Sequence, residues 1–117
     1  MIVRSRGDAE PFTTADGSTI RVLLDGAHGT RNQSLAEAAL DPGRSTERHY
    51  HAETEELYVL LEGTGEMEVD GERREVGPGD AILLSPGAWH QIRAGAGGLR
   101  FLCCCAPPYR HEDTFFA

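Results

Sequence analysis

The chain has 117 residues and a formal net charge of −8, and its eleven basic residues are all arginine. A net negative charge of this size repels phosphate backbones and anionic lipid surfaces, so we expect neither nucleic acid nor a membrane as a partner. The lack of lysine excludes Schiff-base chemistry on a side-chain amine. The length predicts one domain, and a chain without a signal-peptide core or a run of about eighteen apolar residues is expected to be cytoplasmic.

Short strands separated by turns are predicted along most of the chain. Apolar or alternating segments lie at 20–24, 56–62, 66–69, 81–84, 90–94 and 99–105. Asp70-Gly71 predicts a hairpin after 66–69, and the glycine-rich segment 95–98 predicts a turn between the last two strands. Pro107-Pro108 ends the last one. Several short strands separated by turns predict a sandwich or barrel.

The segment 34–40, Ser-Leu-Ala-Glu-Ala-Ala-Leu, differs from its surroundings. It is rich in strong helix formers, so its local propensity predicts a helix.

Three histidines and a carboxylate carry the most specific chemistry of the chain. Side chains alternate along an extended strand, so His49 and His51 share one face while Tyr50 points to the other. Two imidazoles on one face can bind the same divalent transition metal ion, and His90 offers a third. From geometry alone the carboxylate stays open, because a set of three glutamates follows closely: Glu53, Glu55 and Glu56. His28 and His111 have no such pattern.

The wider spacing resembles the two motifs of the cupin superfamily. The first runs from Gly43 through His49, His51 and Glu56 to Gly63, and the second runs from Gly79-Asp80 to His90. Two positions depart from the family pattern, since Ser85 replaces a proline and Ala94 replaces an asparagine, but neither change removes a metal ligand. The resemblance implies an all-β double-stranded β-helix, the jelly-roll barrel, in which 34–40 is a strand.

The resemblance also implies an organisation and a site. We expect a single cupin domain over 1–117, with a core at about 34–106, an N-terminal strand segment at 1–33 and a C-terminal tail at 107–117 that packs on the core. The implied ligands of one divalent ion are His49, His51, Glu56 and His90. Iron, manganese, nickel, cobalt, zinc and copper are all compatible with imidazole and carboxylate ligands.

Four protein ligands leave open positions on an ion that prefers six. A redox-active ion could then support a dioxygenase, whereas a Lewis acid could support isomerase, lyase, decarboxylase or cyclase chemistry on a small oxygen-bearing metabolite. A non-catalytic module that binds or senses a small ligand is the alternative. Tyr58 and Trp89 are candidates for shaping the pocket, with plain packing as the competing role.

Two further features bear on assembly and redox state. If Glu56 faces inward, Tyr58 and Leu60 do too, and an outward apolar face of Leu57, Val59 and Leu61 predicts a homodimer.

Three consecutive cysteines, Cys103 to Cys105, are poorly placed for a disulfide with one another, so we expect reduced, buried, small apolar residues. The tail could form a lid, but we expect Phe115 and Phe116 to pack on the outside of the barrel.

Overall fold

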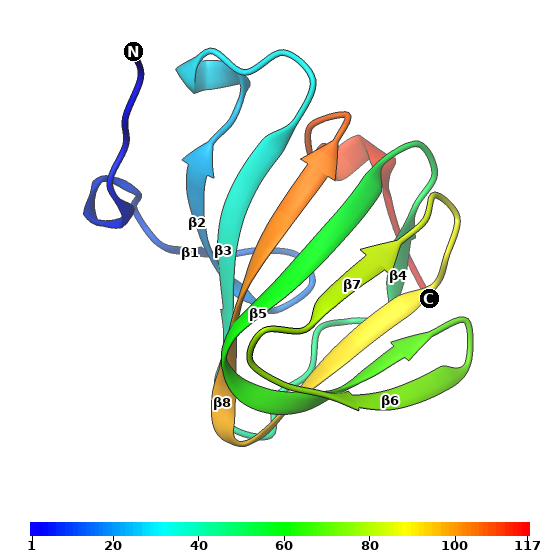
Figure 1. Ribbon diagram of the computed structural model, residues 1–117. Helices are drawn as coiled ribbons and strands as arrows, with labels where there is room; N and C mark the ends of the chain where they lie inside the picture. The colour runs from blue at the N-terminus through cyan, green and yellow to red at the C-terminus, as the bar shows by residue number, and fades with distance from the viewer.

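A computed structural model describes all residues, 1–117, and confirms the predicted all-β class (Figure 1). Its strands are β1 Phe12–Thr13, β2 Thr19–Leu24, β3 Ser34–Leu40, β4 His49–His51, β5 Glu55–Val69, β6 Glu72–Val76, β7 Ala81–Leu84, β8 His90–Ala106 and β9 Thr114–Phe116. Single 3₁₀ turns occur at Arg6–Asp8, Gly26–His28 and His111–Asp113. None of these helical turns has the length or apolar character needed to span a membrane.

The strands form a curled antiparallel sheet that closes into a jelly-roll barrel, because β5 and β8 are long and bend together (Figure 1). Residues 55–63 of β5 pair with 99–106 of β8, and residues 65–69 pair with 90–94. Strands β7 and β3 flank the first of these pairings, whereas β6 and β4 flank the second. The two long strands therefore pass from one layer of the barrel to the other.

Glycines permit the shared bend. Gly63 and Gly98 have φ of 82° and 77°, and a Cβ on Gly63 would collide with the backbone oxygen of Gly98. The turn predicted at 95–98 is therefore wrong, because this segment is a bend inside one strand, β8. Likewise, 56–62 and 66–69 belong to one strand, β5, because pairing with β8 continues on both sides of the bend.

Residues 34–40 form the strand β3, as the family resemblance implies and against their helix propensity. The strand is paired along both edges, with β2 on one side and β8 on the other. Ala38 and Leu40 are buried in the core of the barrel. Tertiary pairing and burial outweigh a local preference of a few tenths of a kcal/mol per residue, roughly the spread among ordinary residues.

The alternation predicted for β5 is confirmed. Tyr58 and Leu60 are buried in the core, while Leu57 and Val59 are exposed on the opposite face; Leu61 is half-buried. The core also contains Phe101 and Ile92 from β8.

The tail adds a strand that the sequence does not reveal. Strand β9 pairs with β4, placing Phe115 opposite Tyr50 and Phe116 opposite His49. Phe115 is exposed and stacks on Tyr50, as expected for a residue outside the barrel. The expectation for Phe116 is wrong, because it lines the internal cavity, and alternation along β9 is the reason.

Candidate metal centre

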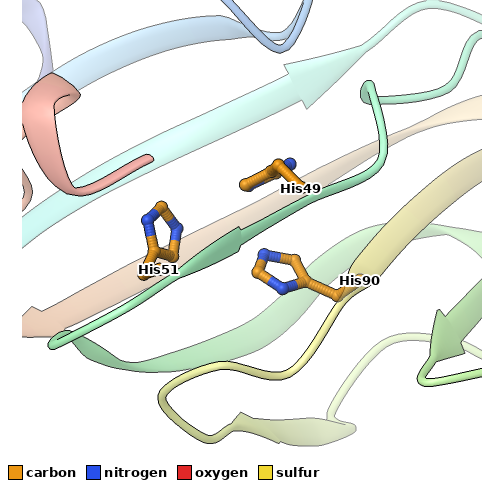
Figure 2. Close-up of side chains that lie close together, drawn as sticks. All are labelled: His49, His51 and His90. Atoms are coloured by element: carbon orange, nitrogen blue, oxygen red, sulfur yellow. The ribbon is translucent and has the colours of Figure 1, made fainter. Parts of the chain in front are cut away.

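Three imidazole rings from two neighbouring strands surround one point (Figure 2). His49 and His51 come from β4, and His90 begins β8 directly opposite His49 in the register. One ring nitrogen from each lies within 4.8 Å of the others, and all three rings are buried. The intervening Tyr50 points outward, with its ring against Trp89 and Phe115. The triad is therefore positioned to hold a metal ion.

Backbone carbonyls fix the orientation of each ring. The Nδ1 of His49 donates to the carbonyl of Glu47 at 2.7 Å, and that of His90 donates to the carbonyl of Ala88 at 3.0 Å. The Nδ1 of His51 lies 3.2 Å from the carbonyl of Asp113. A carbonyl only accepts, so Nδ1 carries the proton, and each Nε2 of a neutral ring keeps its lone pair for an ion.

Among the three competing glutamates, only Glu56 reaches the histidines. Its Oε1 lies 3.3 Å from His51 Nε2 and 3.7 Å from His90 Nε2, although it is not within the mutual 4.8 Å group of the triad. Glu53 instead pairs with Arg110 on the surface at 3.0 Å, and Glu55 is exposed.

Two buried atoms at this point have no hydrogen-bond partner: Glu56 Oε1 and His90 Nε2. Both residues are almost inaccessible, with exposures of 5% and 1%. Leaving buried acceptors unpaired costs about 1–3 kcal/mol each, and a divalent cation would satisfy both. The donor set therefore fits the metal ion that the family resemblance implies.

The pKa values of the centre reflect both its burial and the closeness of its carboxylate to the imidazoles. Burial and the neighbouring charge of His49 lower the pKa of His90 to about 4, so that ring is neutral at physiological pH. Burial opposes the charge on Glu56, but the adjacent His51 outweighs it and lowers the pKa of the carboxyl. Burial lowers the pKa of His51, but Glu56 and then Asp113 together outweigh it, so the pKa of this ring is raised.

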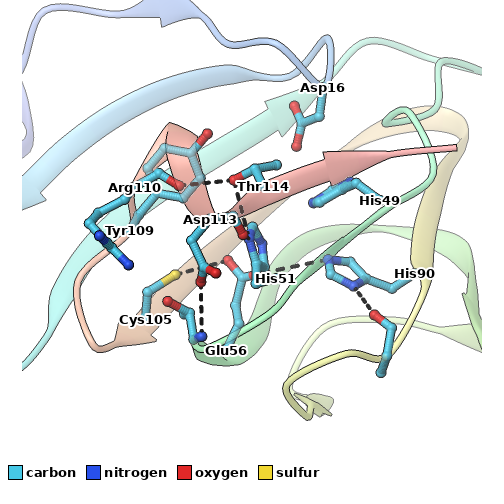
Figure 3. Close-up of polar contacts among 12 residues, drawn as sticks. Asp16, His49, His51, Glu56, His90, Cys105, Tyr109, Arg110, Asp113 and Thr114 are labelled. Carbon is cyan, nitrogen blue, oxygen red and sulfur yellow. Dashed lines mark hydrogen bonds and ion pairs between the residues drawn. The ribbon is translucent and has the colours of Figure 1, made fainter.

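A buried thiol holds the other oxygen of Glu56 (Figure 3). Cys105 Sγ donates to Glu56 Oε2 at 3.2 Å, and burial followed by the charge of Glu56 raises the pKa of this thiol. The three cysteines are free, as predicted, but only Cys105 is fully buried; Cys103 and Cys104 are half-buried. The sequence interpretation of Cys105 as plain packing missed its contact with Glu56.

Asp113 in the tail organises the turn between His51 and Glu56. Its carboxylate accepts hydrogen bonds from the backbone amides of Ala52, Glu53 and Thr54 at 3.0–3.2 Å. These bonds lower the pKa of Asp113 against the opposing effect of burial. No local pattern predicts this residue, because its partners lie about sixty positions earlier in the chain.

The two residues predicted to shape the pocket, Tyr58 and Trp89, lie in different places. Tyr58 lines the internal cavity together with His51 and Glu56. Trp89 does not line it: its ring packs against Tyr50 at 4.6 Å between centroids, and the guanidinium of Arg48 lies 5.0 Å above it. The structure thus leaves Trp89 on the outer side of the strand that carries the histidines.

Known proteins resemble the chain in sequence and in fold. A family model for the cupin domain matches residues 36–105. The uncharacterized protein MJ1618 of Methanocaldococcus jannaschii is 46% identical over 107 residues, covering 90% of this chain and 86% of that protein. The L-ectoine synthase of Bordetella parapertussis is 34% identical over 122 residues, covering 97% of this chain and 89% of that protein.

A solved structure extends the likeness. The polyketide cyclase RemF from Streptomyces resistomycificus superimposes with a TM-score of 0.81 at 30% identity, covering 97% of this chain and 89% of that one. Motif order, barrel topology and these relatives agree, and the chain belongs to the cupin superfamily.

Proposed function

We propose that the chain is a metal-dependent enzyme that uses Lewis-acid chemistry on a small oxygen-bearing metabolite. The observation that carries the proposal is the donor arrangement: three rings hold their protons on the backbone side and converge with their free nitrogens, and two of these nitrogens, on His51 and His90, lie beside an unpartnered oxygen of Glu56. His49, His51, His90 and Glu56 would hold the ion. A divalent ion bound there would polarise a carbonyl or stabilise an enolate.

The relatives support non-redox chemistry over a dioxygenase. One similar protein is named a synthase and another a polyketide cyclase, and neither name describes an oxidation. The chain's own residues would bind and shield the substrate, because apolar and aromatic side chains make up the larger part of the cavity wall beside the histidines. Such walls exclude water and strengthen the electrostatic effect of the centre.

Metal content tests the centre itself. We expect about one equivalent of a transition metal in protein purified without a metal-binding tag, and loss of uptake in the double variant His49→Ala, His51→Ala. Replacing the exposed His111 by alanine is the matched control and should leave uptake unchanged. Less than about a tenth of an equivalent, with none bound on addition, would reject the proposal.

Proton exchange tests catalysis without knowledge of the substrate. Lewis-acid activation acidifies the C–H bonds next to a carbonyl, so NMR in deuterated water should reveal metal-dependent exchange in at least one member of a set of small keto and hydroxy acids. Zn²⁺, which has no redox chemistry, should support this exchange, whereas Glu56→Gln should abolish it. Ligand binding without any exchange would instead indicate a non-catalytic binding module, and metal-dependent oxygen consumption would indicate a dioxygenase.

We also propose that the chain forms a homodimer through the outer face of β5 and β7. Leu57 and Leu83 are paired across these strands, and they are 43% and 55% exposed. Val59 extends the same apolar face. A second copy laid on this face would remove it from water.

A further inference from the structure

The cavity beside the histidines contains negative charge and no basic side chain apart from the imidazoles. It has a volume of about 120 Å³, several times the roughly 10–15 Å³ that a single water needs. Its lining includes the carboxylates of Asp16, Asp25 and Glu56, but none of the eleven arginines. Five aromatic side chains complete the walls: Phe12, Tyr58, Phe101, Tyr109 and Phe116.

Asp16 is the carboxylate available to a ligand. Its Oδ1 accepts hydrogen bonds from the amide and the hydroxyl of Ser18 at 2.9 Å and 2.6 Å, which fixes the side chain, and no ion pair neutralises it. Asp25, by contrast, lies 3.0 Å from His28 Nδ1 and accepts from the amide of Ala27. The Nδ1 of His28 accepts from the backbone amide of Asp25, so it does not neutralise that carboxylate, but Asp25 is occupied in capping the turn Gly26–His28.

Asp16 and Glu56 belong to different ends of the site. Asp16 lies on the loop between β1 and β2, whereas Glu56 lies near the start of β5 beside His51 and His90. In Figure 3, Asp16 lies on the opposite side of Thr114 from Glu56. Glu56 Oε1 is buried and unpartnered, so the histidine end of the cavity is already built for a cation to which an oxygen ligand can bind.

The charges favour one class of ligand. An anionic group far from the metal centre would meet the Asp16 carboxylate without any guanidinium to bind it, and like charges repel. A cationic group would meet a carboxylate in a cavity lined by aromatic rings, and both can attract positive charge. We propose that the substrate has an oxygen donor at the metal end and a positively charged nitrogen at the Asp16 end. This inference rests on the proposed metal centre.

Three matched chelating probes test the charge preference. The first is a butanohydroxamate with a terminal trimethylammonium group, the second is its neutral tert-butyl isostere, and the third is glutarate monohydroxamate, which ends in a carboxylate. Binding is measured under nitrogen to protein reconstituted with Co²⁺, whose visible spectrum reports the hydroxamate entering the metal centre. We expect the cationic probe to bind about three- to tenfold more tightly than its neutral isostere, and the carboxylate probe to bind least.

Variants separate the role of Asp16 from the overall charge. Asp16→Asn keeps the oxygen that accepts from Ser18, and it should remove the preference for the cation while leaving the affinity of the neutral probe unchanged. Asp41→Asn removes the same charge from an exposed loop residue outside the cavity and should leave the preference intact.

The outcomes distinguish the two proposals. If the protein takes up no Co²⁺, the metal centre itself fails, before any probe is added. If the loaded protein binds all three probes with a normal spectral change but the neutral isostere binds as tightly as the cation, the metal centre stands and the inference about the substrate is overturned. An unchanged preference in Asp16→Asn would equally reject the role of Asp16.

Discussion

Substitution of Cys105 should show whether its thiol positions Glu56. By donating to Oε2 it leaves Oε1 directed at the histidines. We expect Cys105→Ala to weaken metal affinity about tenfold, and Cys105→Ser, which keeps a donor, to retain most of it. Competition titration with a chromophoric chelator measures both. Cys104→Ala, on the neighbouring outward position, is the control, and a Cys105→Ala variant with wild-type affinity would show that the thiol does not orient the ligand.

His90 should make the stability of the metal-free protein depend on pH. Its pKa is about 4 in the folded state against an ordinary value of 6.5. Between these values the unfolded chain binds more protons, so folding stability rises with pH and falls on acidification. From about pH 7 to about pH 5, His90 should cost on the order of 2 kcal/mol of unfolding free energy. Urea titrations should show a weaker pH dependence in His90→Gln, while the exposed His111→Gln behaves as wild type; equal dependence in all three would contradict this.

Among the strands, β5 and β8 share a bend that allows both of them to pass from one layer of the barrel to the other. Gly63→Ala places a side chain at a positive φ and against the Gly98 backbone, so we expect a loss of about 3 kcal/mol of unfolding free energy. Gly97→Ala lies in the same bend with no atom within 4 Å of the added methyl, and should change stability by less than about 1 kcal/mol. Chemical denaturation compares the two. Equal losses would mean that the bend tolerates substitution at Gly63 as well.

At the scale of the whole molecule, the exposed face of β5 and β7 sets the expected assembly. Leu83 is the most exposed residue of the apolar group on this face, so Leu83→Glu should convert a dimer into a monomer by placing like charges across the interface. Light scattering at micromolar concentration reads the mass directly. Val3→Glu adds the same charge to the exposed N-terminal segment, far from β7 in Figure 1, and should leave the dimer intact. A wild-type protein that is monomeric at this concentration would exclude the interface.

Patterns of period two could be read from the sequence because they depend only on neighbouring residues. Alternation alone places His49 and His51 on one face with Tyr50 on the other, and it correctly separates Tyr58 from Leu57. The resemblance to the two cupin motifs implied the barrel and the place of His90 beside the other two histidines. Local alternation therefore predicted the shared face of His49 and His51, whereas the jelly-roll barrel was implied by the family resemblance.

Long-range pairing explains the features of the fold that local patterns predicted wrongly or left open. Alternation breaks at the turn after His51, whose amides donate to Asp113 at the far end of the chain, and Glu56 rather than Glu53 lies beside the histidines. Long-range pairing also makes the segment 95–98 a bend and not a turn, because β5 pairs with β8 on both sides of it. Local sequence patterns were enough to nominate the histidines as metal ligands. That Asp16, Cys105 and Phe116 line the same cavity as these histidines could be seen only in the folded chain, because such contacts form once distant strands have paired.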